Sequence, residues 1–568
     1  MSASSSRIHR LAPPLLAGGV GLAAFLVQFG PGALDPTNLH WLMTGDWGAH
    51  LLGWLFFRHT PWEWPLTTIP TLAWPAGATI AYTDSIPLLA LPAKLLSRWL
   101  PDSIQYIGPW LALCFVLQGV FGALLTSSFS PKPLHAALGG ALMTLSPVLL
   151  RRAVGHDSLS AHWLLLALLW LNIREQGRPR ASLIAAVSLV LLAATVHPTL
   201  WAMTAVLAFA LVARFRMEGQ LGWRGVALTS VVLIAGTALL FAALGYVGGD
   251  TPRQGGGFGH FSADLLTLVN PMGSSRVLPS LPTGAGQYEG GGYLGLGALL
   301  LVGWAMFLFV RARRDLSPDI RRRWTPVVVA AILMALFAAS SVVTIAGHEI
   351  LGLRTVYRPF LSLVEPFRSS GRFIWPLHYL AIAFALAVVL KGWRVGPLWK
   401  SAVLGAAFLI QVVDVPRDAP NSYIDARVGD DWLKLRAERW SELAEGRTKL
   451  VLYPPMLHDG AGRGCGKSDF WPGDFQLSSG WLALRHRMAV NSAYLARIDE
   501  ERIQAYCKSL EREVQRGELD PATLYVVAPQ LLADFQKIEG AHCEALDGVH
   551  ACLRAEASLL PTTKTTPE

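Results

Sequence analysis

The chain has 568 residues, of which 52% are hydrophobic and only 15% are charged. This composition is too apolar for an ordinary soluble protein, and it favours a polytopic α-helical membrane protein. The net charge of +9 does not indicate nucleic-acid binding, because the excess basic residues lie mainly in short connections between apolar segments.

Eleven apolar segments are long enough, or nearly so, to cross a bilayer, which needs about 17–25 helical residues. We expect these spans at residues 11–29, 103–126, 133–150, 160–173, 181–196, 198–213, 224–246, 292–310, 325–345, 373–390 and 400–414. The first segment lacks a small-residue cleavage site before a soluble domain, so a retained helix is expected rather than a signal peptide. The apolar run 84–98 is interrupted by two prolines and is expected to be an interfacial or re-entrant helix.

Basic residues distinguish two sets of connections between these spans. Eighteen basic and four acidic residues lie in the first set, which comprises the N-terminus and loops 127–132, 174–180, 214–224, 311–324 and 391–400. Eleven basic and 11 acidic residues lie in the second set, which comprises loops 30–102, 151–159, 248–291 and 347–372. The positive-inside rule then places the N-terminus in the cytoplasm and the C-terminal tail outside.

The tail, residues 415–568, is more polar than the rest and holds four of the five cysteines. An even set of cysteines in an exported domain predicts two disulfides, whereas four unpaired thiols would be expected in a cytoplasmic domain. The sidedness of the charges favours the exported domain. Apolar runs at 449–455 and 522–528, separated by a charged helical stretch, predict a small α/β fold. We therefore divide the chain into a membrane domain, 1–414, and an exported domain, 415–568.

One disulfide pairing follows from a predicted turn. The segment AHCEALDGVHAC is typical of a hairpin whose two turn residues are Asp and Gly. Counting outward from this turn places Cys543 opposite Cys552, at a non-hydrogen-bonded pair where side chains approach closely. Cys465 and Cys507 are then left to pair with each other.

Ionisable residues gather in the first long connection, 30–102, in the stretch TGDWGAHLLGWLFFRHTPWEWP. Asp46 and His50 are four residues apart and share a helix face, which Trp54 extends. The pattern predicts an amphipathic helix on the membrane surface. Interfacial anchoring explains the tryptophans, but a carboxylate near the acyl boundary is costly unless it is paired or functional. Asp46 is therefore a candidate catalytic residue.

The connection RRAVGHDSLSAHW, 151–163, carries Arg151, Arg152, His156 and Asp157. Asp157 suits the N-cap of the following helix equally well. Paired arginines on the outer side depart from the positive-inside rule and indicate an anionic partner, for which phosphate is the natural candidate.

Three further segments add candidate binding residues: the junction of the spans 181–196 and 198–213, and the connections 248–291 and 347–372. These residues are His197, His260, Glu289, Arg358, Arg368 and Arg372. A helix-cap role is the alternative for His197, which precedes a proline that begins a span. A structural ion pair with Glu365 is the alternative for Arg368. Taken together, these residues predict a polar cavity at one membrane face, with carboxylates for catalysis and cations for phosphate.

The strings GDWGAHLLGWLFFRHTPW, YTDSIPLLALPAKLL, LCFVLQGVFGALL, YEGGGYLGLG and FRSSGRFIWP resemble a bacterial branch of the GT-C superfamily of integral-membrane glycosyltransferases. The resemblance implies a helical bundle whose first outer loop carries amphipathic helices and a catalytic acid. Asp46 would be the general base, with His50, His156 and Asp157 lining its site. Arg368 and Arg372, with Arg151 and Arg152, would hold the phosphate of a lipid-linked donor.

The implied reaction is inverting transfer of a sugar from a polyprenyl-phosphate donor to a glycan, lipid or protein acceptor, at the outer face of a bacterial inner membrane. No tandem acidic motif adjoins Asp46, so the need for a divalent metal ion stays open. The sequence contains no nucleotide-binding loop, which argues against ATP-driven transport by this chain alone. The alternatives are a transporter or flippase of a lipid-linked glycan, which predicts inverted repeats and charges within the spans, and a non-catalytic scaffold of envelope assembly.

Overall fold

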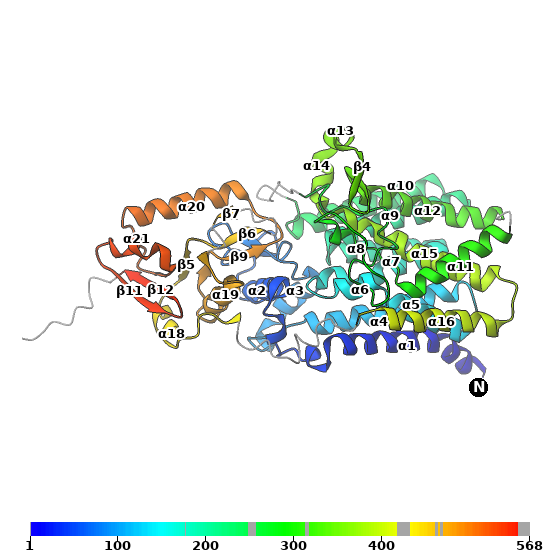
Figure 1. The fold of residues 1–568 in the computed structure, drawn as a ribbon, viewed down its shortest axis with the longest axis horizontal. Coiled ribbons are helices and arrows are strands. Elements are labelled where there is room, and N and C mark those ends of the chain that lie inside the picture. The colour runs from blue at the N-terminus through cyan, green and yellow to red at the C-terminus, as the bar shows by residue number, and fades with distance from the viewer. Residues whose placement is uncertain are drawn as a thin grey trace, which may run out of the picture.

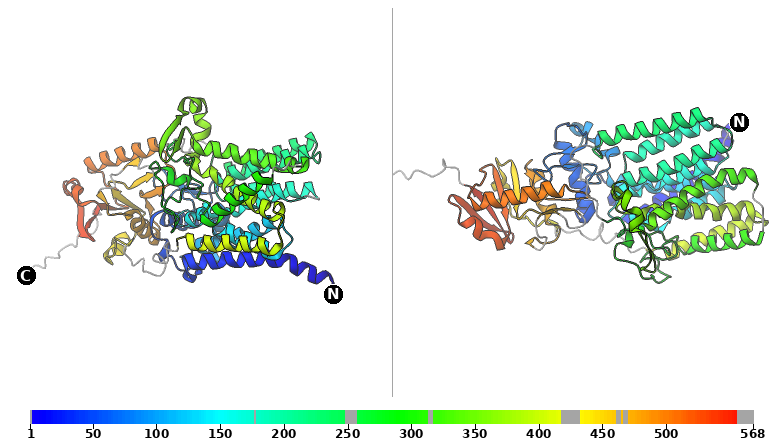
Figure 2. Two further views of the ribbon diagram at one scale, coloured as in Figure 1. Left: turned by 45° about the vertical axis from the view of Figure 1, so that its right-hand side comes forward. Right: turned by 90° about the horizontal axis from the view of Figure 1, so that it is seen from above.

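The computed structural model describes residues 2–175, 178–247, 257–312, 317–416, 432–459, 464–465 and 470–554. A helical bundle occupies one end of the molecule, and a smaller domain of strands and helices occupies the other (Figure 1). The N-terminus lies at the end of the bundle far from the C-terminal domain, as both views in Figure 2 also show. The bundle helices are α1 Ser2–Phe29, α4 Ile107–Ser127, α5 Pro133–Thr144, α6 Pro147–Arg152, α7 Trp163–Ile173, α8 Pro179–Ala194, α9 Pro198–Met217, α10 Trp223–Ala243, α11 Leu296–Ala312, α12 Pro318–Ala339, α15 Trp375–Ala387 and α16 Pro397–Asp414.

Within the described residues, seven helical segments are long and apolar enough to cross a membrane: 12–29, 107–127, 198–217, 223–243, 318–339, 370–392 and 397–414. Three shorter apolar helical segments lie at 157–173, 179–194 and 296–312. In α10, the large apolar side chains Leu228, Ile234 and Leu239 are exposed, as expected for a helix that faces lipid rather than water. The helical class is therefore confirmed and the seven candidate spans support a membrane protein, whereas the count of eleven spans stays a prediction.

Two predicted spans differ from the observed elements. The segment 133–150 is divided into α5 and α6, because Pro147 disfavours helical conformation in the residue before it and begins a new helix. The segment 325–345 ends early: α12 stops at Ala339, and the β-branched run that follows forms strand β3, Val342–Ile345, paired with β4, His348–Gly352. Beyond this hairpin, two short helices follow, α13 Arg354–Tyr357 and α14 Leu361–Val364.

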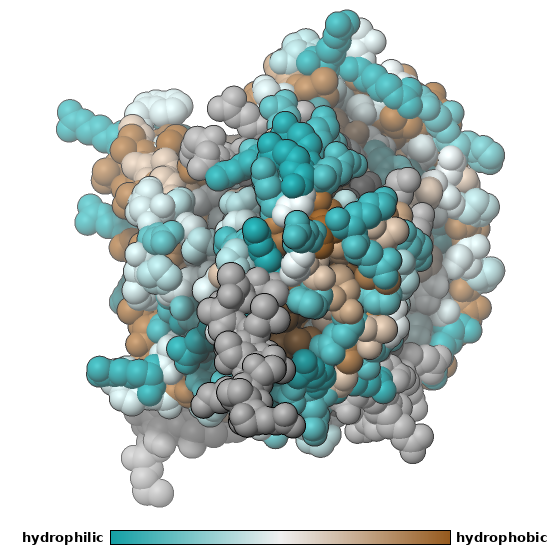
Figure 3. All heavy atoms as spheres, turned by 90° about the vertical axis from the view of Figure 1, so that its left-hand side faces the viewer, coloured by the Kyte–Doolittle hydropathy of each residue, from teal (hydrophilic) through white to brown (hydrophobic). Residues whose placement is uncertain are grey.

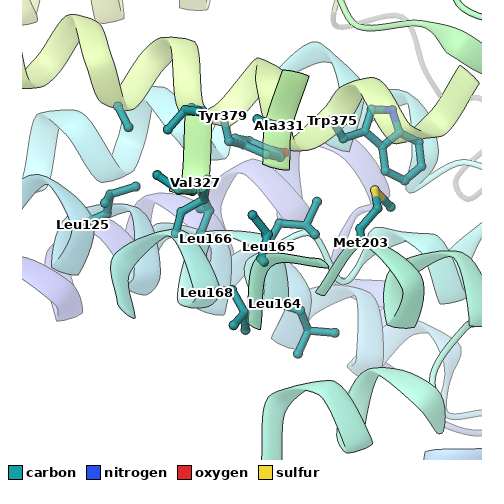
Figure 4. Close-up of a cluster of buried hydrophobic side chains, with 14 of the residues drawn as sticks. Leu125, Leu164, Leu165, Leu166, Leu168, Met203, Val327, Ala331, Trp375 and Tyr379 are labelled. Atoms are coloured by element: carbon teal, nitrogen blue, oxygen red, sulfur yellow. The ribbon is translucent and has the colours of Figure 1, made fainter. Parts of the chain in front are cut away.

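The centre of the bundle is α7, which is apolar on every side and is buried at all positions except Trp170. A helix without a polar face must be surrounded by other elements. Figure 4 shows leucines of α7 packed among residues from α4, α9, α12 and α15, including Leu125, Met203, Val327 and Tyr379. This packing fixes the positions at which the bundle helices end, and hence where their connections meet.

The C-terminal domain is a small α/β unit, as predicted. Its main sheet has the order β11-β12-β10-β5-β8, with β5, β8 and β10 parallel. A second sheet has the order β7-β6-β9. The strands are β5 Lys449–Tyr453, β6 Leu457–Asp459, β7 Gly464–Cys465, β8 Ala489–Val490, β9 Ala493–Leu495, β10 Thr523–Val527, β11 Ala541–Leu546 and β12 Val549–Arg554, and the helices are α18 Arg439–Ala444, α19 Phe475–Arg485, α20 Glu500–Gln515 and α21 Leu532–Gln536.

Both predicted cysteine pairs are at disulfide distance. Cys543 and Cys552 face each other across the β11–β12 hairpin, with their Cα atoms 4.1 Å apart. The turn residues Asp547 and Gly548 both have positive φ, as a two-residue hairpin turn requires. The second pair, Cys465 with Cys507, joins β7 to α20.

The first connection is folded between the bundle and the C-terminal domain. It contains α2 Gly45–His59, the short strands β1 Thr68–Ile69 and β2 Ala78–Thr79, and α3 Pro87–Leu95. Contrary to the expectation of one buried face, nearly all of α2 from Trp47 to Arg58 is buried, because α19 of the C-terminal domain packs against it. Backbone hydrogen bonds reinforce this contact: the Val490 amide donates to the Thr71 carbonyl, and the Trp74 amide donates to the Val490 carbonyl. The two domains therefore share one hydrophobic core.

Candidate functional site

A polar cavity of about 300 Å³ lies where the four connections of the second set meet the C-terminal domain. The pattern of basic residues predicts that these four connections lie at one membrane face. Residues from all four line the same cavity, which lies at one end of the bundle. Seven of the predicted site residues line the cavity: Asp46, His50, His156, His197, Glu289, Arg368 and Arg372. Figure 3 looks onto the C-terminal domain end of the molecule, where hydrophilic side chains are mixed with smaller apolar patches.

Asp46 lies in the first turn of α2, and its carboxylate faces His156. The distance from Asp46 Oδ2 to His156 Nδ1 is 3.6 Å, and the other ring nitrogen of His156 lies 4.0 Å from Glu289 Oε1. Burial raises the pKa of Asp46, which makes its carboxylate a stronger base than an exposed one. Burial and the nearby Arg152 lower the pKa of His156 well below its usual value, so the ring is neutral at pH 7.

His50 lies one turn after Asp46 and contacts Asp157 through a buried ion pair between Nδ1 and Oδ1. Burial alone would lower the pKa of His50, but the charge and hydrogen bond of Asp157 raise it to about 9. His156 is the N-cap of the helical turn that contains Asp157, and His162 is the N-cap of the following helix α7, so Asp157 occupies neither cap position. Its second oxygen, Oδ2, is buried without a hydrogen-bond partner among the described residues. The capping alternative for Asp157 is therefore wrong.

Asp84, a further acid of the first connection, also lines the cavity. Its Oδ1 lies 3.7 Å from His197 Nε2, and burial raises the pKa of its carboxyl. His197 also caps α9, because its Nδ1 accepts a hydrogen bond from the Thr199 amide. A neutral His197 must then carry its proton on Nε2, the atom that faces Asp84. The capping role of His197 is therefore confirmed, its ring also lines the cavity, and its role in ligand binding stays a prediction.

Two arginines converge on Glu289. Arg152 Nη1 and Arg372 Nε each lie 2.9 Å from Glu289 Oε2. Burial raises the pKa of Glu289, but Arg372 and Arg152 together hold it well below its usual range. Burial also lowers the pKa of Arg152, to about 10, still far above neutrality. Arg152 is therefore charged at pH 7, and Glu289 partly compensates the two guanidinium groups.

The remaining predicted residues differ in position. Arg151 lies outside the polar cavity and donates a hydrogen bond to the Met272 carbonyl. Arg358 lies in the short helical segment after α13, and His260 is exposed; neither lines the cavity. Arg368 lines the cavity with its guanidinium carbon 5.8 Å from the centroid of the Phe261 ring. No ion pair with Glu365 is present among the described residues.

The C-terminal domain supplies part of the wall, which no sequence motif indicated. Tyr494, Ala496 and Arg497, at and just after β9, line the cavity. The Ala496 amide donates to the Tyr82 carbonyl over 2.9 Å, and Arg497 donates to the Pro366 carbonyl. These contacts hold the domain against both the first connection and the segment that follows α14.

A second, larger cavity adjoins the first. Its volume is about 1080 Å³, and its walls are mainly apolar side chains from α1 and α16, such as Val20, Val27 and Phe408. Arg151, Arg152 and His156 line it as well. His156 and Tyr288 are common to both cavities. An apolar chamber between two apolar helices thus adjoins a chamber of ionisable groups.

The carboxylates and imidazoles do not form a ligand set for a metal ion. Among the described residues, no three His, Cys, Asp or Glu side chains converge in a suitable arrangement. Instead, three of the acids each lie near one imidazole: Asp46 near His156, Asp157 near His50, and Asp84 near His197. The residues therefore do not fit the divalent ion that the sequence left open.

Together, the fold and the cavities define a helical membrane protein with a buried polar site at one end of its bundle. The family model described as "domain of unknown function (DUF6311)" matches residues 18–416, and the model of the DUF6311 C-terminal domain matches residues 439–554. The chain belongs to the DUF6311 family. A comparison with curated proteins found no match.

Proposed function

We propose that this protein is an inverting glycosyltransferase of the GT-C type, which transfers a sugar from a polyprenyl-phosphate donor to a glycan, lipid or protein acceptor of the cell envelope. The site would face the outer side of a bacterial inner membrane, with the C-terminal domain in the periplasm. This location rests on the basic residues of the opposite connections and on the paired cysteines.

The junction of the two cavities carries the proposal. A lipid-linked sugar needs an apolar chamber for its chain and, beside it, a polar chamber for the sugar. The apolar cavity between α1 and α16 adjoins the polar cavity at His156 and Tyr288. Arg151 and Arg152 line the apolar cavity beside this junction, where a phosphate would lie and where guanidinium groups bind it best.

Asp46 is the general base of the proposed reaction. The acceptor hydroxyl attacks the anomeric carbon of the donor sugar, the bond from that carbon to the phosphate oxygen breaks, and polyprenyl phosphate leaves. Asp46 takes the hydroxyl proton, and the arginines stabilise the charge of the leaving phosphate. The raised pKa of Asp46 suits this role, because a stronger base takes the proton more readily.

The test is a transfer assay in membranes that contain the wild-type protein, Asp46→Asn or Asp35→Asn at matched levels. A panel of radiolabelled polyprenyl-phosphate sugars serves as donors, and native envelope material serves as the acceptor. Asp35 is a matched control, since it lies in the same connection but its exposed carboxylate accepts hydrogen bonds from the Thr37 amide and hydroxyl and does not line the cavity. We expect transfer by the wild type and by Asp35→Asn, and a loss of at least 100-fold in Asp46→Asn.

Transfer that persists in Asp46→Asn would exclude this residue as the base. If no donor in the panel depends on the wild-type protein, the glycosyltransferase proposal fails, and a transporter or scaffold becomes the better account. A scaffold predicts that Asp46→Asn leaves envelope assembly intact, and a flippase predicts loss of lipid translocation instead of transfer.

A further inference from the structure

Two segments far apart in sequence meet at the side of the polar cavity formed by the C-terminal domain. One is 366–369, which follows α14, and the other is 494–497, which includes the end of β9. Arg497 joins them by donating a hydrogen bond to the Pro366 carbonyl. The apolar cavity is lined by neither segment. This side of the polar cavity is therefore separate from the place proposed for the lipid.

The two segments bring cations into the cavity. Arg368 has no carboxylate within ion-pair distance among the described residues, unlike Arg152 and Arg372, which both contact Glu289. Arg497 adds a second guanidinium group from the other segment. A guanidinium group is always charged and presents planar donors that match phosphate and carboxylate oxygens. Guanidinium groups from two different segments thus line this side of the cavity, which suits an anionic ligand.

Aromatic rings accompany these cations. Tyr82, Phe261, Phe367 and Tyr494 line the same cavity as Arg368 and Arg497. Ligand sites commonly combine such apolar ring surfaces with a few charged groups that fix the orientation of the ligand. A saccharide has both apolar ring faces and hydroxyl groups, and it therefore suits a wall of this composition.

We propose that Arg368, Arg497 and Tyr494 form the binding subsite for the acceptor, and that the acceptor is an anionic saccharide bearing phosphate or carboxylate. The inference rests on the proposed glycosyltransferase function, because it assigns the second substrate of that reaction. The C-terminal domain is then a component of the acceptor site, in which Arg497 and Tyr494 determine specificity.

The experiment measures binding of three soluble probes to the purified full-length protein: glucose 1-phosphate, glucuronate and glucose. Variants are Arg368→Gln and Arg497→Gln, with Arg354→Gln as the matched control, because Arg354 is exposed, pairs with Glu349 and lies outside the cavity. We expect the two anionic probes to bind more tightly than glucose. Each cavity variant should weaken their binding by about tenfold or more, and the control should not change it. The corresponding lysine variants keep the charge but lose the planar donors, so they should bind with intermediate affinity.

Binding of a polyprenyl phosphate, measured on the same samples, reports whether each variant is folded and tests the donor site separately. The inference is overturned if glucose binds as tightly as the anionic probes, if no probe binds, or if both glutamine variants bind like the wild type. It is also overturned if Arg151→Gln, rather than the cavity variants, abolishes anion binding, because the anion would then occupy the donor-phosphate site. If a glutamine variant does not bind polyprenyl phosphate, the lysine variant at the same position is measured in its place. An anion affinity of that lysine variant equal to the wild-type affinity would also overturn the inference.

Discussion

His50 and Asp157 form a buried ion pair between α2 and the connection that precedes α7, across 107 residues of sequence. Asp46 and His156, the neighbours of these residues in the two segments, also face each other. The contact between the two segments is therefore made by two carboxylate–imidazole pairs side by side. The His50–Asp157 pair is buried, whereas the Asp46–His156 pair is partly exposed.

The ion pair predicts how stability depends on pH. Because the folded-state pKa of His50 is raised from 6.5 to about 9, its contribution is fully present below pH 6.5 and is lost as the pH rises through about 9. A shift of this size corresponds to a contribution on the order of 3 kcal/mol. The melting temperature of the detergent-solubilised protein should therefore fall between pH 6.5 and 9, and His50→Gln should flatten this fall while lowering stability overall.

His260→Gln is the control for this series, because His260 is exposed and makes no ion pair among the described residues. It should melt with the same pH dependence as the wild type. An equal slope in His50→Gln and in the wild type would mean that His50 is not the titrating group. Asp157→Asn should resemble His50→Gln, since it removes the charge that holds the proton on the imidazole.

The contact of Glu289 with two arginines predicts a large effect of removing its charge. Glu289→Gln leaves Arg152 and Arg372 buried near each other without a carboxylate, which we expect to cost about 3–5 kcal/mol of folding free energy. The double variant Glu289→Gln/Arg152→Met should regain part of this loss, because one uncompensated cation is then removed. Chemical denaturation of the purified protein measures both values. Similar stability of Glu289→Gln and Glu365→Gln, a partly exposed control, would contradict the prediction.

Part of this site was predictable from local spacing. The four-residue interval from Asp46 to His50 placed both on one turn of helix, and the alternation of basic residues assigned their connection and three others to one end of the bundle. Both inferences depend only on helix period and charge, which the sequence contains directly. The hairpin with Cys543 and Cys552 was predictable for the same reason, because its turn sets the register.

Contacts between distant connections were not predictable in this way. Glu289 could not be matched to Arg152 and Arg372, since any acid and base of these connections would have satisfied the sequence equally well. Tyr494 and Arg497 had no motif, because their position depends on how the C-terminal domain packs on α2. That same packing buries α2 on nearly all sides, where the pattern of its apolar residues indicated a helix on the membrane surface.

The cysteines predict a test of the compartment. If the C-terminal domain is exported, Cys465–Cys507 and Cys543–Cys552 form in the cell, and only the buried Cys114 stays reduced. Protein denatured directly from cells should then react with one maleimide per chain before reduction and with five after it. Five reactive thiols before reduction would place the domain in a reducing compartment and reverse the predicted topology.

The two disulfides should contribute unequally to stability. Cys465–Cys507 joins residues 42 apart in sequence, and Cys543–Cys552 joins residues nine apart. The loss of chain entropy in the unfolded state then predicts that removing each disulfide lowers the free energy of unfolding by about 4 and about 3 kcal/mol, respectively. Cys465→Ser/Cys507→Ser also removes the covalent link between β7 and α20. In Cys543→Ser/Cys552→Ser, the turn still sets the register of the β11–β12 hairpin. Denaturation of the two double variants compares the losses, and a larger loss for the hairpin pair would contradict the chain-entropy argument.

The packing of α1 against α4 predicts that a single methyl group will disrupt the bundle. A Cβ atom added to Gly119 of α4 would lie 2.1 Å from the Ala17 carbonyl oxygen of α1, so one helix backbone must move. Small residues that let helices approach this closely are typical of membrane bundles. Gly119→Ala should therefore destabilise the protein by about 1–3 kcal/mol or more. Gly405→Ala in α16 makes the same chemical change in open space and should be neutral or slightly stabilising. Thermal melting and gel filtration in detergent compare the two variants, and equal melting temperatures would mean that α1 and α4 do not pack at this distance.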